Sequence, residues 1–186
     1  MKDKRLDLSD RVVKKKPKNR RKKTKKSDKV RSLFYINING YTSKRDSMKD
    51  IIQRTSPDII VLCETKVGSK KKWNIENYES VSRNCSFGKG GILVAAKYGT
   101  YNSFLKVAKS KNDGILVARM EYGKRVIRIV AVYGPQETSE KEVKEDFYND
   151  LNIEIECGKY HNEEILIIGD LNGKLDLKEC KLKSTI

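Results

Sequence analysis

A short segment near the end of the chain, ILIIGDLNGKLD, passes from four aliphatic residues directly into Gly-Asp-Leu-Asn. The carboxylate of Asp170 and the amide of Asn172 therefore lie two positions apart, at the end of an apolar run that is typical of a buried strand. A carboxylate in that place can deprotonate a water molecule or bind a cation. A simple turn is the alternative, because Asp and Asn often close turns.

Four more polar residues stand at or just after the ends of apolar segments: Asn37, Asn39, Glu64 and Tyr133. With Asp170 and Asn172 they supply two carboxylates, several amides and a phenol. Such a set can hold a hard divalent metal ion through one or two carboxylates and leave room for the phosphate oxygens of a substrate. Each residue taken singly also has an ordinary explanation as a turn former or a solvated side chain.

Two strand-helix-strand units are expected to position these residues. In the first, an apolar strand over 32–38 is followed by a helix over 43–57, with Met48, Ile51 and Ile52 on one face, and by a buried strand over 58–65. Strands joined in this way usually pair in parallel through a right-handed crossover. Their carboxyl ends, with Asn37 to Gly40 and Glu64, should therefore share one rim.

The second unit combines a strand over 125–133, a helix over 139–159 and a strand over 163–170. The helix is indicated by Val143, Phe147, Leu151 and Ile155 at spacings of four, with Ser139 as the expected N-cap. This unit places Tyr133 and Asp170 on a common rim. Between the two units, segments 78–84, 90–99, 101–109, 114–123 and 125–136 alternate with turn residues and predict antiparallel hairpins.

The first 31 residues differ in composition from the rest. They carry 16 Lys and Arg against 4 acids, a local net charge of +12 out of +16 for the 186-residue chain. The run from Lys14 to Lys26 has ten basic residues in thirteen and no aromatic residue. We expect residues 1–31 to form a disordered basic tail that binds nucleic acid or serves as a nuclear-import signal, with a solubilising charge run as the alternative.

Other function classes are disfavoured by what the sequence contains. No apolar run approaches the length of a membrane span, and no apolar secretory signal is present. The four cysteines are widely separated and His161 is the one histidine, which argues against a structural zinc site and a disulfide framework. We therefore expect a protein of a reducing compartment, nuclear or otherwise cytoplasmic, with no membrane partner.

Five segments in order carry a family resemblance: FYINING, PDIIVLCETK, GGILVA, VAVYGPQ and ILIIGDLNGKL. They resemble the endonuclease/exonuclease/phosphatase superfamily, and most of all the apurinic-type endonuclease domain of non-LTR retrotransposons. The resemblance covers roughly residues 32 to 176. It implies an α/β fold, a four-layer α/β/β/α sandwich of two mixed sheets over residues 32–186, incomplete at the C-terminus.

The resemblance also implies a magnesium- or manganese-dependent phosphodiester hydrolase that nicks DNA, with RNA as an alternative partner. Glu64 would be the principal metal ligand, with Asn39 as a further one, and Asn37 would position metal and phosphate. Tyr133 would donate a hydrogen bond to the scissile phosphate. Asp170 would orient or deprotonate the attacking water, with Asn172 beside it.

A basic loop, GSKKKWN, follows Glu64 and is expected on the same rim. Lys70, Lys71 and Lys72 could contact phosphates, and Trp73 could stack on or wedge between bases. In the alternative, the loop is solvated and Trp73 packs against the sheet.

The chain departs from the family pattern in one respect. Relatives complete the site with a Ser-Asp-His tripeptide, whereas only 14 residues follow Asn172 here and none of them is histidine. His161 precedes the Gly-Asp-Leu-Asn strand and is expected in a surface loop. We therefore expect a weak or inactive nuclease, the front part of a longer endonuclease. The alternatives are a non-catalytic retroelement fragment that binds nucleic acid through its basic arm, and a small-molecule phosphatase.

Overall fold

The computed structural model describes residues 32–68, 73, 75–84, 90–107 and 110–173. The expected basic tail and the expected C-terminal incompleteness lie outside these residues. Strands and helices follow one another in this order: β1 (Leu33–Asn37), η1 (Thr42–Lys44), α1 (Arg45–Thr55), β2 (Ile59–Cys63), β3 (Tyr78–Arg83), β4 (Ile92–Lys97), β5 (Ser103–Lys106), β6 (Ile115–Tyr122), β7 (Arg125–Tyr133), α2 (Lys141–Tyr160) and β8 (Glu164–Asp170).

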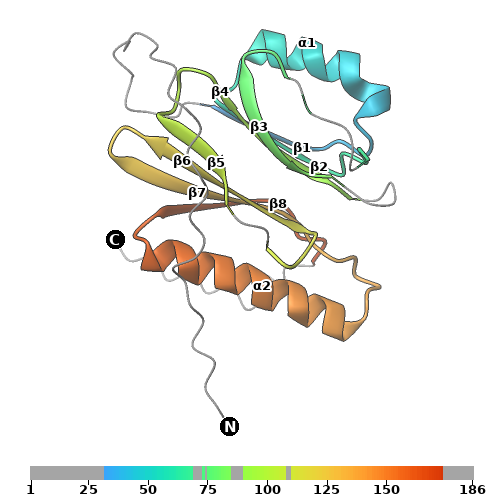
Figure 1. Cartoon of the computed structure of the whole chain (residues 1–186). Helices are drawn as coiled ribbons and strands as arrows, with labels where there is room; N and C mark the ends of the chain where they lie inside the picture. The colour runs from blue at the N-terminus through green and yellow to red at the C-terminus, as the bar shows by residue number, and fades with distance from the viewer. Residues whose placement is uncertain (1–31, 69–72, 74, 85–89, 108–109, 174–186) are drawn as a thin grey trace, which may run out of the picture.

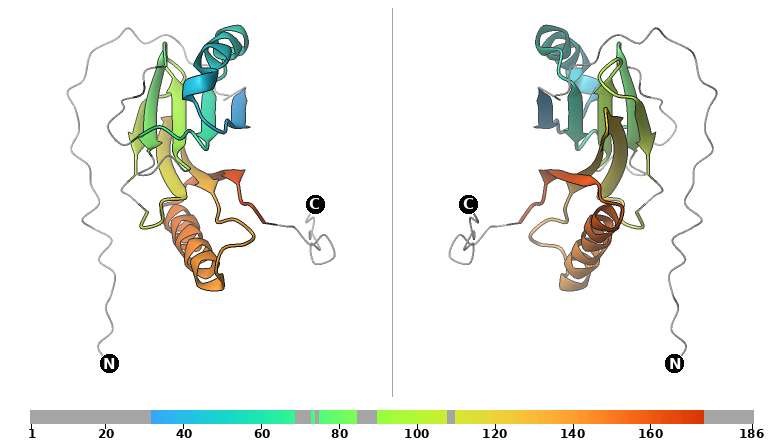
Figure 2. Two further views of the ribbon diagram at one scale, coloured as in Figure 1. Left: turned by 90° about the vertical axis from the view of Figure 1, so that its right-hand side faces the viewer. Right: turned by 90° about the vertical axis from the view of Figure 1, so that its left-hand side faces the viewer.

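The elements form four layers, which confirms the predicted sandwich. One sheet has the strand order β1-β2-β4-β3 and the other β5-β6-β7-β8. Figure 1 shows the two sheets face to face, with α1 on the outside of the first and α2 on the outside of the second. The side views in Figure 2 show the same layering. Each sheet contains one parallel pair and two antiparallel pairs, so both are mixed as expected.

The first strand-helix-strand unit has the predicted arrangement. β1 and β2 pair in parallel with Asn37 opposite Cys63, so Glu64 follows directly at the same rim. On α1, Met48 and Ile52 are buried against the first sheet, because they lie four positions apart on one helical face. Ile51, expected on that face too, is half-buried.

Three of the predicted antiparallel pairs are present, β3 with β4 in the first sheet and β5 with β6 and β6 with β7 in the second. The predicted pairing of segments 90–99 and 101–109 was wrong, because β4 and β5 belong to different sheets. The chain changes sheets between β4 and β5. Alternate residues of both sheets point into the space between them, where Val61 and Val94 meet Ala118 and Ala131 in the central core. The thiol of Cys63 donates a hydrogen bond to the carbonyl of Val132 across this core at 3.3 Å.

The second unit brings β7 and β8 together in parallel, with Tyr133 opposite Asp170. Phe147 and Leu151 of α2 are buried against the second sheet as expected, whereas Val143 is 47% exposed. The prediction of Ser139 as the N-cap was wrong. Its backbone N–H donates to the carbonyl of Gln136, so Ser139 closes a turn before the helix.

The cap position of α2 is instead occupied by Glu140, which makes no side-chain capping bond. A buried ion-pair network holds α2 in place. Arg128 of β7 contacts Glu154 of α2 at 3.0 Å and Glu163 at 2.7 Å, and the side chains of all three are 5% exposed or less. Because an unpaired buried charge is costly, this network ties the helix to the strand that carries Tyr133. Among the described residues, neither α1 nor α2 is long and apolar enough to span a membrane.

Candidate active site

The polar residues singled out in the sequence meet where the rims of the two sheets adjoin. Asn37 ends β1 and Glu64 follows β2 in the first sheet, while Tyr133 ends β7 and Asp170 ends β8 in the second. Parallel pairing within each unit brings each pair of strand ends to one edge. Stacking of the sheets then brings the two edges together, which the sequence could not specify.

The side chain of Asn37 joins the two carboxylates. Its Nδ2 donates hydrogen bonds to Glu64 Oε1 at 3.0 Å and to Asp170 Oδ2 at 3.2 Å. Its Oδ1 accepts a hydrogen bond from the backbone N–H of Asn39 at 3.2 Å. Since both carboxylates can only accept when ionised, this amide orientation is the one that satisfies every partner. Asn37 therefore sets the relative position of Glu64 and Asp170.

Both oxygens of the Glu64 carboxylate have partners. Its Oε1 accepts from Asn37 and from the hydroxyl of Tyr133 at 2.9 Å, and its Oε2 lies 3.5 Å from Nζ of Lys66. The hydrogen bond from Asn37 lowers the pKa of Glu64 most, with the phenol and the lysine adding to it against the effect of burial. Its φ of 51° is left-handed, which is uncommon outside glycine and typical of strained functional positions. The carboxylate is thus kept ionised and fixed in direction.

Tyr133 remains a proton donor in this setting. Its pKa is raised above the usual value for tyrosine, first by burial and then by the hydrogen bond and charge of Glu64. The hydrogen bond with Asn172 lowers the pKa of Tyr133 and offsets part of this increase. Because the phenol stays protonated at neutral pH, it can give a hydrogen bond to a negatively charged oxygen placed beside Glu64.

The Asp170 to Asn172 segment is a turn with a defined structure. Asp170 Oδ1 accepts from the backbone N–H of Asn172 at 2.9 Å, and Asn172 Nδ2 donates to the carbonyl of Gly134 at 2.8 Å. The backbone N–H of Gly134 donates in return to the carbonyl of Asp170 at 2.7 Å. The turn interpretation and the catalytic interpretation are therefore compatible, since the turn is what orients the carboxylate.

Gly169 allows this approach of β8 to β7. It has a φ of 150°, and a Cβ at this position would lie 1.8 Å from the carbonyl oxygen of Val132. That separation is far shorter than any real contact of a Cβ atom, so a side chain here would force the strands apart. The glycine is therefore needed to deliver Asp170 to the site.

Lys66 is a site residue that the sequence analysis did not identify. Its ammonium group donates to Oδ1 of Asn39 as well as facing Glu64. Asn39 thus contacts the site through Lys66 and through Asn37. Lys66 follows Glu64 by two positions at the same strand end, and this spacing was the signal available in the sequence.

Two further groups lie behind the site. Burial raises the pKa of Tyr35 on β1 to about 12, with the charges of Cys63, Asp170 and Glu64 adding to the effect. Burial also raises the pKa of the Cys63 thiol to about 11. Cys63 is fully buried and its thiol is hydrogen-bonded to the carbonyl of Val132, so it forms part of the core that supports the strand ends.

The predicted nucleic-acid contacts are only partly described. Lys70, Lys71 and Lys72 lie outside the described residues. Trp73 is half-buried against the first sheet, donates from Nε1 to Asn84 at 2.9 Å and meets the ring of Tyr41 edge-on at 4.5 Å. Its role in stacking on bases stays a prediction. His161 is exposed at the end of α2, against the ring of Tyr160.

The donor set fits a hard divalent cation. Mg²⁺ prefers oxygen ligands and is commonly held by one or two carboxylates, with water and phosphate completing the shell. Glu64 and Asp170 supply carboxylate oxygens and Asn39 supplies an amide oxygen at the same rim. Within the described ranges no three His, Cys, Asp or Glu residues cluster as a metal site.

Comparison with protein families gave one match. The model described as "Endonuclease/Exonuclease/phosphatase family" matches residues 34–184, which include every strand end described above. The comparison with curated protein sequences gave no significant match.

Solved structures share the fold. The catalytic domain of Xenopus laevis APE2 superposes with a TM-score of 0.64 at 19% identity, over 77% of this chain and 59% of that one. The AP endonuclease LMAP from Leishmania major gives 0.64 at 14% identity, over 76% and 55%. The 3' phosphatase NExo from Neisseria, solved with a product DNA hairpin, gives 0.60 at 16% identity, over 76% and 57%. The chain thus spans less than two thirds of the length of each.

Proposed function

The chain belongs to the endonuclease/exonuclease/phosphatase family, and on that premise we propose that its strand-end site hydrolyses phosphodiester bonds in DNA with a divalent metal ion, Mg²⁺ or Mn²⁺. One observation carries the proposal. The amide of Asn37 binds Glu64 of one sheet and Asp170 of the other at once, so two carboxylates face a common space beside a protonated phenol. A DNA-nicking endonuclease of a retroelement is the form of this activity that the sequence resemblance favours.

Glu64 would hold the metal ion, with Asn39 as a further oxygen ligand. A bound metal would supply Lewis-acid stabilisation of the charge that builds on phosphorus during in-line displacement. The ammonium group of Lys66 now contacts both Glu64 and Asn39, so it would turn away when a metal ion binds there and would then attract a phosphate oxygen.

Asp170 would accept the proton of the attacking water as the oxygen of that water bonds to phosphorus and the P–O bond to the leaving sugar oxygen breaks. A solvent water would protonate the leaving oxygen. Oδ1 and Oδ2 of Asp170 each accept one hydrogen bond, from Asn172 and Asn37, and each oxygen can still accept a further proton. Tyr133 would turn its hydroxyl from Glu64 to a non-bridging phosphate oxygen, where it stabilises developing negative charge. Asn37 would keep base and metal ligand at a fixed separation throughout.

We propose that turnover by this chain is slow. The described site contains no imidazole. His161, the one histidine of the sequence, precedes β8, whereas Asp170 ends it. A strand of seven residues separates the two by roughly 20 Å. Loss of one member of a cooperating set commonly costs orders of magnitude in rate.

The proposed partner is DNA. The basic segment from Lys14 to Lys26 and the three lysines at 70–72 would bind phosphates without reading sequence, and the former would also direct the protein to the nucleus. Such binding should weaken steeply as salt is raised, because it depends on counterion release.

The test is nicking of supercoiled plasmid and of a duplex oligonucleotide with one abasic site, in Mg²⁺, in Mn²⁺ and in EDTA. We expect slow, metal-dependent cleavage that falls about 100-fold or more in Glu64→Gln and in Asp170→Asn. Glu140→Gln, a change of equal charge at the start of α2, is the matched control and should cleave normally.

Other outcomes separate the alternatives. If no metal-dependent cleavage is seen, the proposed hydrolase activity is refuted. If salt-sensitive DNA binding then persists in Glu64→Gln, the protein is a non-catalytic nucleic-acid binder. Release of phosphate from small phosphate esters with intact DNA would support a phosphatase instead.

A further inference from the structure

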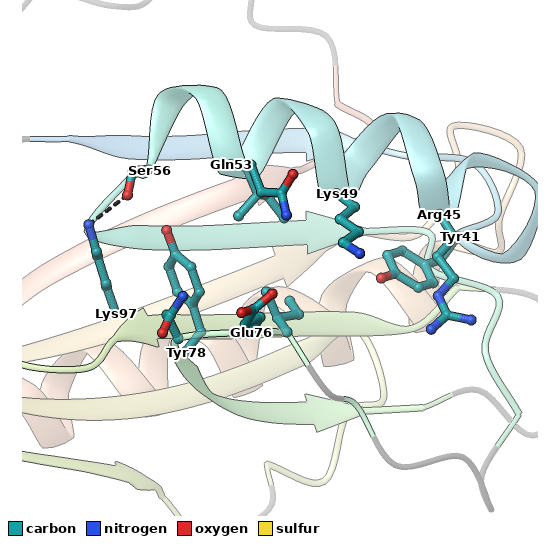
Figure 3. Close-up of a pocket in the computed structure, with 11 residues that line it drawn as sticks. Tyr41, Arg45, Lys49, Gln53, Ser56, Glu76, Tyr78 and Lys97 are labelled. Atoms are coloured by element: carbon teal, nitrogen blue, oxygen red, sulfur yellow. Dashed lines mark hydrogen bonds between the residues drawn. The ribbon is translucent and has the colours of Figure 1, made fainter.

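A hollow of about 380 Å³ lies between α1 and the turn that leads into β3, and none of the active-site residues described above lines it. In Figure 3, α1 runs along the top of the hollow. Tyr41, Arg45 and Lys49 gather at one end, Ser56 and Lys97 stand at the other, and Glu76 lies between them.

The helix presents a polar row to this hollow. Arg45, Lys49 and Gln53 line it at spacings of four, which place them on one face of α1, and Ser56 lines it from the C-cap position just after the helix. The far end is closed by Lys97, whose Nζ donates to the hydroxyl of Ser56 at 2.6 Å. The row and its closing lysine thus form one continuous wall.

The floor of the hollow is apolar. Ile52, Ile75 and Tyr78 line it and are each less than 9% exposed. The hydroxyl of Tyr78 donates to the carbonyl of Pro57 at 2.7 Å, which fixes the ring. A flat apolar ligand could therefore lie on a rigid surface.

The charges around the hollow favour an anion. Three cations, Arg45, Lys49 and Lys97, face one carboxylate, Glu76. Within the part of the chain that the structure describes, the side chains of Arg45 and Lys49 have no ion pair and no hydrogen bond, and the charge of Arg45 acts on Tyr41, whose pKa it lowers against the effect of burial. Arg54 on the same helix, which does not line the hollow, is paired with Asp50 at 2.7 Å.

We propose that this hollow binds a nucleoside phosphate, with the phosphate on Arg45 and Lys49 and the base over Ile52 and Ile75. The volume lies within the usual range for small-ligand sites of about 300–1,000 Å³. The ligand is either a free nucleotide or one unit of a nucleic-acid strand, since both present the same chemistry. The proposal does not depend on the hydrolytic site.

Trp73 provides the reporter for a test. It is the one tryptophan in the chain, and its ring centroid lies 4.5 Å from that of Tyr41, which lines the hollow. We would follow its fluorescence during titration with AMP, adenosine, inorganic phosphate and a short oligo(dA), in metal-free buffer. We expect AMP to give a saturable change at a concentration where adenosine and phosphate give none.

Charge variants locate the site. Arg45→Gln and Lys49→Gln should each weaken AMP binding about tenfold, because each removes a charge-assisted hydrogen bond. Arg54→Gln is the control on the same helix and should bind normally. Glu76→Gln should bind more tightly than wild type, whereas Glu140→Gln should not. All these side chains are exposed, and circular dichroism would confirm that each variant is folded.

The sources of the ligand are then distinguished. Binding of oligo(dA) with the same dependence on Arg45 and Lys49 indicates a strand site, and binding of AMP alone indicates a free nucleotide. Four results would overturn the proposal: no saturable change at millimolar AMP, an equal response to inorganic phosphate, equal weakening by Arg54→Gln, or loss of the response in Asp170→Asn.

Discussion

Replacing Asn37 by Asp tests whether one amide holds the two carboxylates together. The change keeps the size of the side chain but removes the two N–H donors that now meet Glu64 at 3.0 Å and Asp170 at 3.2 Å. It also places a third carboxylate between them. A hydrogen bond to a charged group contributes about 1.5–3 kcal/mol. Because the site is partly exposed, we use the lower end for each of the two bonds.

The free energy of unfolding should therefore fall by about 3 kcal/mol at neutral pH in metal-free buffer. Repulsion between the new carboxylate and those of Glu64 and Asp170 should lower it further. In the wild type, the pKa of Glu64 is lowered on folding, chiefly by Asn37. Glu64 thus contributes stability that is present above its unfolded-state pKa and is lost as the pH falls through the lower folded value. In Asn37→Asp that contribution should disappear, so the two proteins should differ least in acid.

Urea unfolding followed by circular dichroism, at neutral and acidic pH and with and without Mg²⁺, measures these differences. Mg²⁺ should stabilise Asn37→Asp more than wild type, because a third carboxylate strengthens a cation site. Asn162→Asp, an equal charge change at an exposed turn, is the control and should cost less than about 0.5 kcal/mol. Equal losses in the two variants, or equal stabilisation of Asn37→Asp and wild type by Mg²⁺, would refute the reasoning.

Three further predictions follow from the same site. Tyr133→Phe should raise the pKa of Glu64, measured by carboxylate NMR titration, and slow any cleavage about 100-fold. Gly169→Ala should lower the free energy of unfolding, measured in urea, by about 3 kcal/mol or more, since its Cβ would meet a backbone carbonyl oxygen at 1.8 Å. Gly68→Ala is the control, because a Cβ there meets no atom within 4 Å, and should change the free energy of unfolding by less than about 0.5 kcal/mol. Cys63, fully buried and with a pKa of about 11, should stay unmodified by thiol reagents until the protein unfolds, as mass spectrometry would show; rapid labelling of the folded chain would contradict this.

The positions of the strand ends can be predicted because local patterns determine them. Apolar runs of strand length alternate with helical periodicity, and a right-handed crossover then sends both strands of each unit the same way. For this reason the order of residues is enough to place Asn37 beside Glu64, and Tyr133 beside Asp170. The strand register confirms both placements.

Two details of α2 were not predicted correctly from the local pattern. Ser139 has the residue type of an N-cap, yet a turn with Gln136 takes its backbone N–H and the helix begins after Glu140. Val143 follows the apolar spacing but stays exposed, because it lies in the first turn of α2, outside the cluster that Phe147 and Leu151 form with the second sheet.

By itself the sequence determined the composition of the two rims and the family to which the chain belongs. Only the tertiary structure decided that the rims adjoin, that Asn37 bridges carboxylates from different sheets, that Lys66 enters the site and that a cationic hollow forms beside α1. The physical reason is that the spacing of apolar residues is a local pattern, which identifies each helix and strand and, through the short connections, the direction of each strand. The face-to-face packing of two sheets is instead decided by a core whose members, such as Val61 and Ala131, are distant in the chain.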